Sequence, residues 1–202
     1  MLRKVDKNEK KRAIALAAIP LLAEFGLAKT SVESIALAAN VAKGTVYLYF
    51  KTKEEIILEI WNYVNELLYK NREKRYKTCK SAYEKLVVYF DYSILEESHS
   101  INSLLKILAM NMAIILNLSH SGLVKNYKIE RFKELEDLEK IIKDGVRCEE
   151  FKEVDTLLVA TLFANMFKGT LVNAICLCKN IEQIRKEVHA QKNLLIATLK
   201  KE

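Results

Sequence analysis

The chain has 202 residues, of which 50% are hydrophobic and 29% are charged, and its formal net charge is +7. A chain of this length can bury a core without disulfides or metals, and its composition excludes an intrinsically disordered protein. One proline and five glycines supply few of the tight turns that a β-sandwich or β-barrel needs. The composition therefore favours an all-α protein.

The positive charge is concentrated at the start of the chain. Residues 1–53 hold ten Lys and Arg against four Asp and Glu, a net charge of +6, whereas residues 54–202 carry only +1. A basic segment on a nearly neutral body indicates a polyanionic partner for that segment. A solvated, lysine-rich surface would give the same pattern.

Apolar side chains recur at helical spacing along the whole chain. The first predicted helix covers 7–25 and ends at Gly26. Pro20 falls inside it, which predicts either a kink or a helix that restarts with Pro20 in its first turn. About nine helices are predicted in all, the others over 32–39, 43–49, 53–76, 80–96, 101–118, 122–145, 153–178 and 181–200.

Two predicted helices are apolar enough to be tested as membrane spans. Residues 101–118 contain one charged residue, Lys106, and residues 156–178 contain one, Lys168. A charge near the centre of a span is costly in lipid, and neither segment has an aromatic belt with a basic flank. We therefore expect both to be buried helices of a bundle.

The segment between residues 30 and 53 predicts two short helices joined by a tight turn. Ser31 is a good N-cap for the first, and Asn40 suits a left-handed turn conformation. Val46 and Phe50 fall where they can hold the second helix against a core. This arrangement is a helix-turn-helix, placed here at about 31–50.

The outward face of the second short helix is rich in groups that suit DNA. A cation, a bare backbone, a hydroxyl and two phenols can contact phosphates, base edges and the thymine methyl group. These groups belong to Lys43, Gly44, Thr45, Tyr47 and Tyr49, and Lys51 and Lys53 lie on the flank. Either tyrosine could instead pack against the first helix.

At these positions the sequence resembles the TetR family of bacterial transcriptional regulators, over about residues 8–60. The departures are Asn40 where the family has glycine, Ala42 where it has a capping serine, and Pro20, which is atypical of the family. The matching positions are Thr30-Ser31-Val32, Ile35-Ala36, Ala39-Asn40-Val41-Ala42, Gly44-Thr45, Tyr47, Tyr49-Phe50 and Lys53, with Ile57 where the family has leucine.

The resemblance implies a DNA-binding domain over 1–52 and a helical ligand-binding and dimerisation domain over 53–202. It implies that Lys43 and Thr45 read bases, and that Tyr47 and Tyr49 mainly hold the DNA backbone, as does Lys53. The full set of expected DNA contacts is Ser31, Lys43, Gly44, Thr45, Tyr47, Tyr49, Lys51 and Lys53.

The resemblance also implies a homodimer on a palindromic operator, formed through about 153–178 and 181–200. Ala160 and Ala164 are small residues one turn apart, which would allow close contact between helices. A core within one chain would explain the same residues.

The family further implies a pocket for a small inducer, which we expect to be mainly apolar and to release the protein from DNA. Thr161, Asn165 and Lys168 fall on one helix face and form either a polar wall of a cavity or a solvated stripe. Other candidates for the lining, which could equally be plain core, are Trp61, Tyr89, Tyr92, His99, Met110, Asn111, Met112, Phe163 and Phe167.

Enzymatic and metal-dependent functions find little support. The chain has no glycine-rich phosphate loop, no Cys-x-x-Cys and no His-x-x-x-His, and Glu96-x-x-His99 occurs without a second copy. We therefore expect no cofactor and no metal. With no apolar secretion signal at the start, a cytoplasmic protein is predicted, and the resemblance implies that it is a repressor. The alternative is a helical protein–protein adaptor without specific DNA binding.

Overall fold

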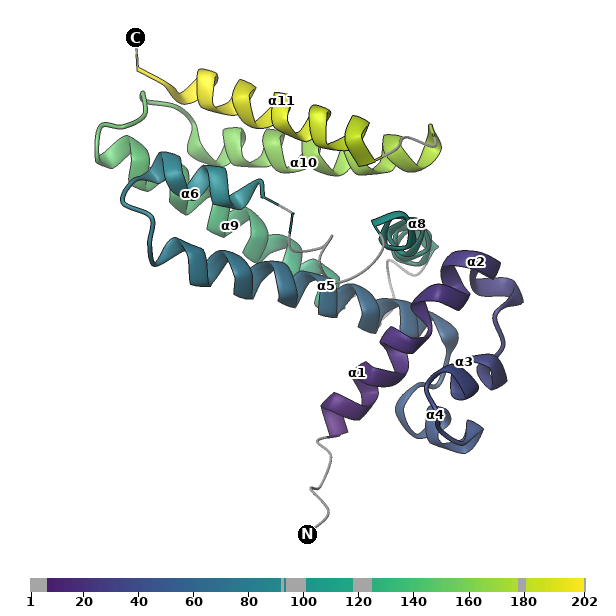
Figure 1. Cartoon of the computed structure of the whole chain (residues 1–202). Helices are drawn as coiled ribbons and strands as arrows, with labels where there is room; N and C mark the ends of the chain where they lie inside the picture. The colour runs from purple at the N-terminus through teal and green to yellow at the C-terminus, as the bar shows by residue number, and fades with distance from the viewer. Residues whose placement is uncertain (1–6, 92, 94–100, 118–124, 178–180, 202) are drawn as a thin grey trace. The chain divides into compact units, whose positions relative to one another are not determined.

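The computed structural model describes residues 7–91, 93, 101–117, 125–177 and 181–201 (Figure 1). Over these ranges it is all-α, as predicted, with one isolated β-bridge between Phe151 and Lys200. The ten helices are α1 (Lys7–Ala17), α2 (Ile19–Lys29), α3 (Val32–Ala38), α4 (Lys43–Tyr49), α5 (Lys53–Tyr76), α6 (Ala82–Tyr89), α8 (Ile101–Asn117), α9 (Lys125–Arg147), α10 (Thr156–Cys176) and α11 (Ile181–Leu199).

The predicted first helix is two helices, which is why the described part of the chain holds ten rather than about nine. α1 ends at Ala17, and Pro20 lies in the first turn of α2, where no backbone N–H is needed. The alternative of a restart at Pro20 is therefore confirmed. Gly26 takes a positive φ of 73° inside α2, so regular helical geometry stops there, as predicted.

The first compact unit combines α1 to α4, most of α5, and α8 from much later in the chain. α8 packs against α2. This unit extends past residue 52, and the functional division between 52 and 53 stays a prediction. Its core contains, among others, Ile14, Ala15, Leu22, Ile35, Val46, Phe50, Ile56, Ile57, Ile60, Ile107 and Ile114.

The second compact unit contains the end of α5 with α6, α9, α10 and α11. The Phe151 ring packs directly over Gly145, where no side chain would fit. The Glu150 carboxylate accepts hydrogen bonds from the first backbone N–H groups of α6, those of Ala82 and Tyr83, at 3.1 and 3.2 Å. These contacts fix the loop after α9 against the start of α6.

α10 differs from an ordinary amphipathic helix, because both of its faces are largely apolar. It packs against α9 and α11 through one face, which includes Ala160 and Ala164 in the core of its own unit. By length and composition alone, the stretch Thr156–Ala174 could cross a membrane, and 33% of it is buried here. The expected burial in a bundle applies to one face of α10, because its opposite face exposes Leu158, Leu162, Asn165, Gly169 and Val172.

Candidate DNA-binding surface

The helix-turn-helix is built as the sequence predicted. The Ser31 hydroxyl accepts a hydrogen bond from the backbone N–H of Ser34 at 3.0 Å and caps α3. Asn40 adopts the left-handed conformation at φ 50°, and the N–H of Val41 returns to the carbonyl of Ala36. α4 then starts without a side-chain cap at Ala42, so its orientation depends on packing rather than on a local hydrogen bond.

α4 has one buried side and one outward side. Val46 and the following Phe50 are buried in the core, and Tyr49 is half-buried against it. At about 100° of rotation per residue, the exposed residues fall on one continuous arc: Lys43, Tyr47, Gly44 and Leu48. Thr45 is half-buried on the far side of the helix from Lys43. The residues of α4 that are expected to contact DNA therefore differ in exposure. Lys43, Gly44 and Tyr47 are exposed, whereas Thr45 and Tyr49 are half-buried.

Lys43 is held at the edge of this arc by two neighbours. Its amino group forms an ion pair with Glu33 of α3 and lies 5.9 Å from the centre of the Tyr47 ring. The hydrogen bond to Lys43 lowers the pKa of Glu33, and the hydrogen bond to Glu33 raises the pKa of Lys43. Both groups are exposed to solvent, so Lys43 stays accessible beside Glu33.

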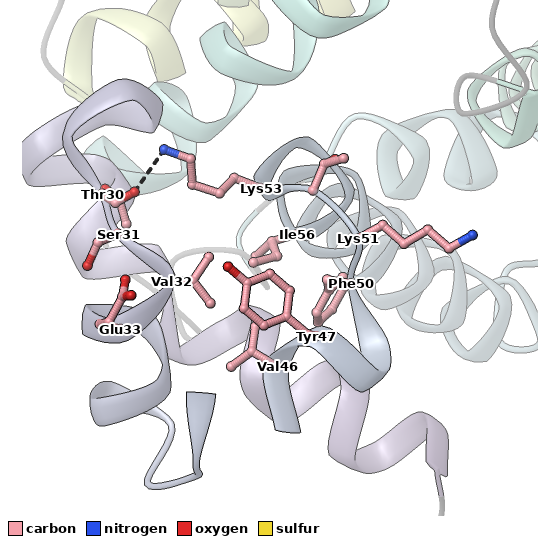
Figure 2. A pocket seen from close by; sticks show the side chains of 11 residues that line it. Thr30, Ser31, Val32, Glu33, Val46, Tyr47, Phe50, Lys51, Lys53 and Ile56 are labelled. Carbon is pink, nitrogen blue, oxygen red and sulfur yellow. Dashed lines mark hydrogen bonds between the residues drawn. The ribbon is translucent and has the colours of Figure 1, made fainter. Parts of the chain in front are cut away.

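A shallow hollow of about 310 Å³ lies between the starts of α3 and α5 and the end of α4 (Figure 2). Tyr47 projects into it, Ser31 and Glu33 form one wall, and the Lys51 amine points away. The lining residues are Thr30, Ser31, Val32, Glu33, Val46, Tyr47, Phe50, Lys51, Thr52, Lys53 and Ile56. Several of the expected DNA contacts are thus brought together at one surface.

Lys53 is engaged within the protein. Its amino group donates to the carbonyl of Leu27 at 2.6 Å and to that of Thr30 at 2.9 Å (Figure 2 draws the bond to Thr30). These are carbonyls at the end of α2 and the start of the motif, so Lys53 ties the first turn of α5 to the entrance of α3. A lysine near a helix end commonly stabilises such carbonyls.

Sequence reasoning missed two residues at this surface, Glu33 and Leu48. Glu33 forms an ion pair with Lys43, and Leu48 is 78% exposed on the motif's second helix. Both could have been found from helical spacing, because Leu48 follows Gly44 by one turn and Glu33 lies in the first turn of α3.

The expected inducer-pocket residues fall in both compact units. In the first unit, Trp61 is half-buried, and Met110 packs against the core. Asn111 is fully buried, and neither its Nδ2 nor its Oδ1 has a hydrogen-bond partner among the described residues. In the second, Tyr89, Phe163 and Phe167 are buried, the first two in the unit's main core cluster. Tyr92 and His99 lie outside the described residues. The pocket stays a prediction.

Asn165 and Lys168 bind residues of α9 rather than forming a plain solvated stripe. The Asn165 carbonyl accepts from Arg131 at 2.8 Å, and the Lys168 amine lies 3.4 Å from the Glu134 carboxylate. Arg131 also pairs with Glu134, at 2.8 Å. This polar cluster links α9 to α10.

Among the residues that the structure describes, no group of three or more His, Cys, Asp or Glu could hold a metal ion.

Comparison with known proteins identifies the family. The model of bacterial regulatory proteins of the TetR family matches residues 14–60. The "Fatty acid metabolism regulator protein" of Bacillus subtilis (strain 168) is 33% identical over 154 residues, covering 73% of this chain and 74% of that protein.

Solved structures agree on the whole fold. The TetR family regulator PfmR from Thermus thermophilus is 25% identical, with a TM-score of 0.69 over 93% of this chain and 99% of that one. A transcriptional regulator from Saccharomonospora viridis, solved in complex with choline, has a TM-score of 0.78 at 15% identity, over 97% of this chain and 100% of that one. The chain belongs to the TetR family of DNA-binding bacterial transcriptional regulators and is not an enzyme.

Proposed function

We propose that the protein is a cytoplasmic repressor that binds a palindromic operator as a homodimer and leaves it when a small, mainly apolar inducer binds. The observation that carries this proposal is the outward arc of α4, on which Lys43, Tyr47 and Gly44 are exposed and Tyr47 lines the hollow. Membership of a DNA-binding family argues against the alternative of a protein–protein adaptor.

In the proposed complex α4 enters the major groove and the DNA backbone passes over the hollow. Lys43 reaches base edges, with Thr45 on the flank, while Ser31, Tyr47 and Lys51 face phosphates. Lys53 stays bound to the carbonyls of Leu27 and Thr30 and supports the motif from behind. Tyr49, packed against the core, contributes at most its outer edge. This division follows from which side chains the fold leaves exposed.

DNA selection by the purified protein at about 0.15 M salt tests this proposal, because salt sets the non-specific background. We expect an enriched palindrome. Lys43→Ala and Tyr47→Ala should then weaken operator binding with helicity unchanged. Lys74→Ala, an exposed cation at the far end of α5, is the matched control and should bind as the parent does. Parental binding by both motif variants would contradict the placement of α4.

The exposed stripe of α10 supports the proposed dimer. Leu158, Leu162, Asn165, Gly169 and Val172 follow one another at spacings of four and three residues, which places them on one face. A side chain at Gly169 would meet no other atom within 4 Å, so the stripe has a bare centre where a partner helix can approach. Exposed apolar surface of this kind is typical of an interface.

The substitution that tests the dimer has to lie outside the hydrophobic core of the chain. Ala164→Glu is unsuitable, because Ala164 is buried within its own unit and a glutamate there would unfold it. Leu162→Glu places a charge on the exposed stripe, and we expect sedimentation to show a monomer with weakened operator binding. Lys74→Glu, which changes the charge at an exposed position by −2 rather than −1, is the control for added negative charge. An unchanged dimer mass for Leu162→Glu would remove this stripe from the interface.

For the inducer, we propose a long-chain fatty acyl compound. The support is the 33% identity to a regulator of fatty acid metabolism together with the apolar composition of α8 and α10. Release requires that the inducer bind better to the form that does not fit the operator. Titration of the operator complex with palmitate and with its coenzyme A thioester should release DNA with at least one of them. Choline, a small polar cation, is the control and should not.

A further inference from the structure

Leu48 is an apolar side chain in a place where packing does not require one. It is 78% exposed, although its neighbours Val46 and Phe50 are buried in the core. On α4 it lies about 40° around the helix from Gly44, at the end of the outward arc opposite Lys43. The exposed arc therefore has a cationic edge, a bare centre and an apolar edge.

The size of an α-helix lets the outward side of α4 enter the groove. A helix with its side chains is about 10–12 Å across, and the major groove is about 12 Å wide. In the proposed complex the apolar edge of the arc, at Leu48, therefore faces base edges. The phosphates outside the groove offer no apolar group. Within it, the C5-methyl group of thymine is the apolar feature of a base edge, and leucine can contact it without competing for a hydrogen bond.

The other fully exposed leucine of the motif does not compete for this role. Leu37 is 83% exposed on α3, the helix that in this motif crosses the DNA backbone. It lies on α3, outside the outward arc of α4. Leu37 therefore serves as a control for a second exposed leucine of the same motif.

We propose that Leu48 is a specificity-determining residue that recognises a thymine by contact with its methyl group. This assignment rests on the proposed operator binding. Each half-site of a symmetric operator would carry one such thymine, read by one protomer. The remainder of the arc, Lys43, Tyr47 and Gly44, recognises polar groups and the backbone, so Leu48 supplies the discrimination that hydrogen bonds alone do not.

The test replaces single thymines of the selected operator by deoxyuridine, which removes only the methyl group. Binding is measured by fluorescence anisotropy at about 0.15 M salt. The parent should lose affinity at one position of the half-site by about fourfold, the transfer value of one buried methyl-sized group. Substitution in both half-sites should give roughly the square of that loss.

Leu48→Ala should bind the thymine operator more weakly than the parent and lose its sensitivity to uracil at that position. Because Leu48 is exposed and alanine favours helix, the variant should unfold as the parent does. Leu37→Ala should keep the full uracil penalty. A penalty that survives Leu48→Ala, or an operator insensitive to uracil at every thymine, would overturn the assignment alone. Absence of any enriched operator would overturn the proposed function, and this assignment with it.

Discussion

Replacing Asn111 by leucine should make the protein more stable. Asn111 is fully buried in α8, with Ile107 one turn before it and Ile114 one turn after it on the same face. Neither its Nδ2 nor its Oδ1 has a hydrogen-bond partner among the described residues. Leucine has nearly the same shape, so the change removes an unsatisfied amide without opening a cavity.

The expected gain follows from the cost of burying an amide without a partner, about 1–3 kcal/mol in proteins. For a chain of this size each kcal/mol shifts the melting temperature by roughly 2–4 °C. Urea unfolding followed by circular dichroism, at one fixed protein concentration, measures the free energy directly. Asn117→Leu, at an exposed position of the same helix, should change it by less than about 0.5 kcal/mol. A loss of stability in Asn111→Leu would refute the reasoning, because it would mean that the amide is hydrogen-bonded in solution.

Three further changes test other contacts. Gly145→Ala should lower the free energy of unfolding by about 1–3 kcal/mol, because the new methyl would overlap the Phe151 ring and lie 2.9 Å from the Ala82 side chain; calorimetry measures this. Burial raises the pKa of Asp137 above 3.8, so folding favours its protonated form and the penalty is present at neutral pH. Asp137→Asn should therefore be the more stable protein at pH 7, and urea titrations should show the difference shrinking as the pH falls towards 3.8. Lys53→Met should lower the melting temperature by several degrees, since it removes charged hydrogen bonds to two carbonyls; an unchanged value would show that they contribute nothing.

The motif was predictable because its signals are local. Ser31 caps α3 and Asn40 turns the chain through their own backbone neighbours, so sequence spacing alone identifies them. The contacts of Lys53 could not be predicted from the sequence, because its partners, the carbonyls of Leu27 and Thr30, lie more than twenty residues away in the chain. A lysine at a helix start looks the same in the sequence whether it binds phosphate or carbonyls.

The second half of the chain shows where periodicity stops being informative. Both faces of α10 are apolar, so the sequence could not say which one holds Ala164 inside the unit and which exposes Leu162. Only the packing of α9 and α11 decides this. The polar positions were ambiguous for the same reason, since Asn165 finds its partner, Arg131, on another helix.

The helix-turn-helix of this protein depends on α8 for its core. Ile107 and Ile114 of α8, about sixty residues beyond the motif, belong to the same hydrophobic cluster as Ile35 and Val46. A graft of residues 1–52 onto another dimerising protein would leave this cluster open to water where α8 had covered it. Recombination in evolution meets the same obstacle: a new protein that takes over this motif has to inherit α8 as well, because α8 completes the core on which the motif rests.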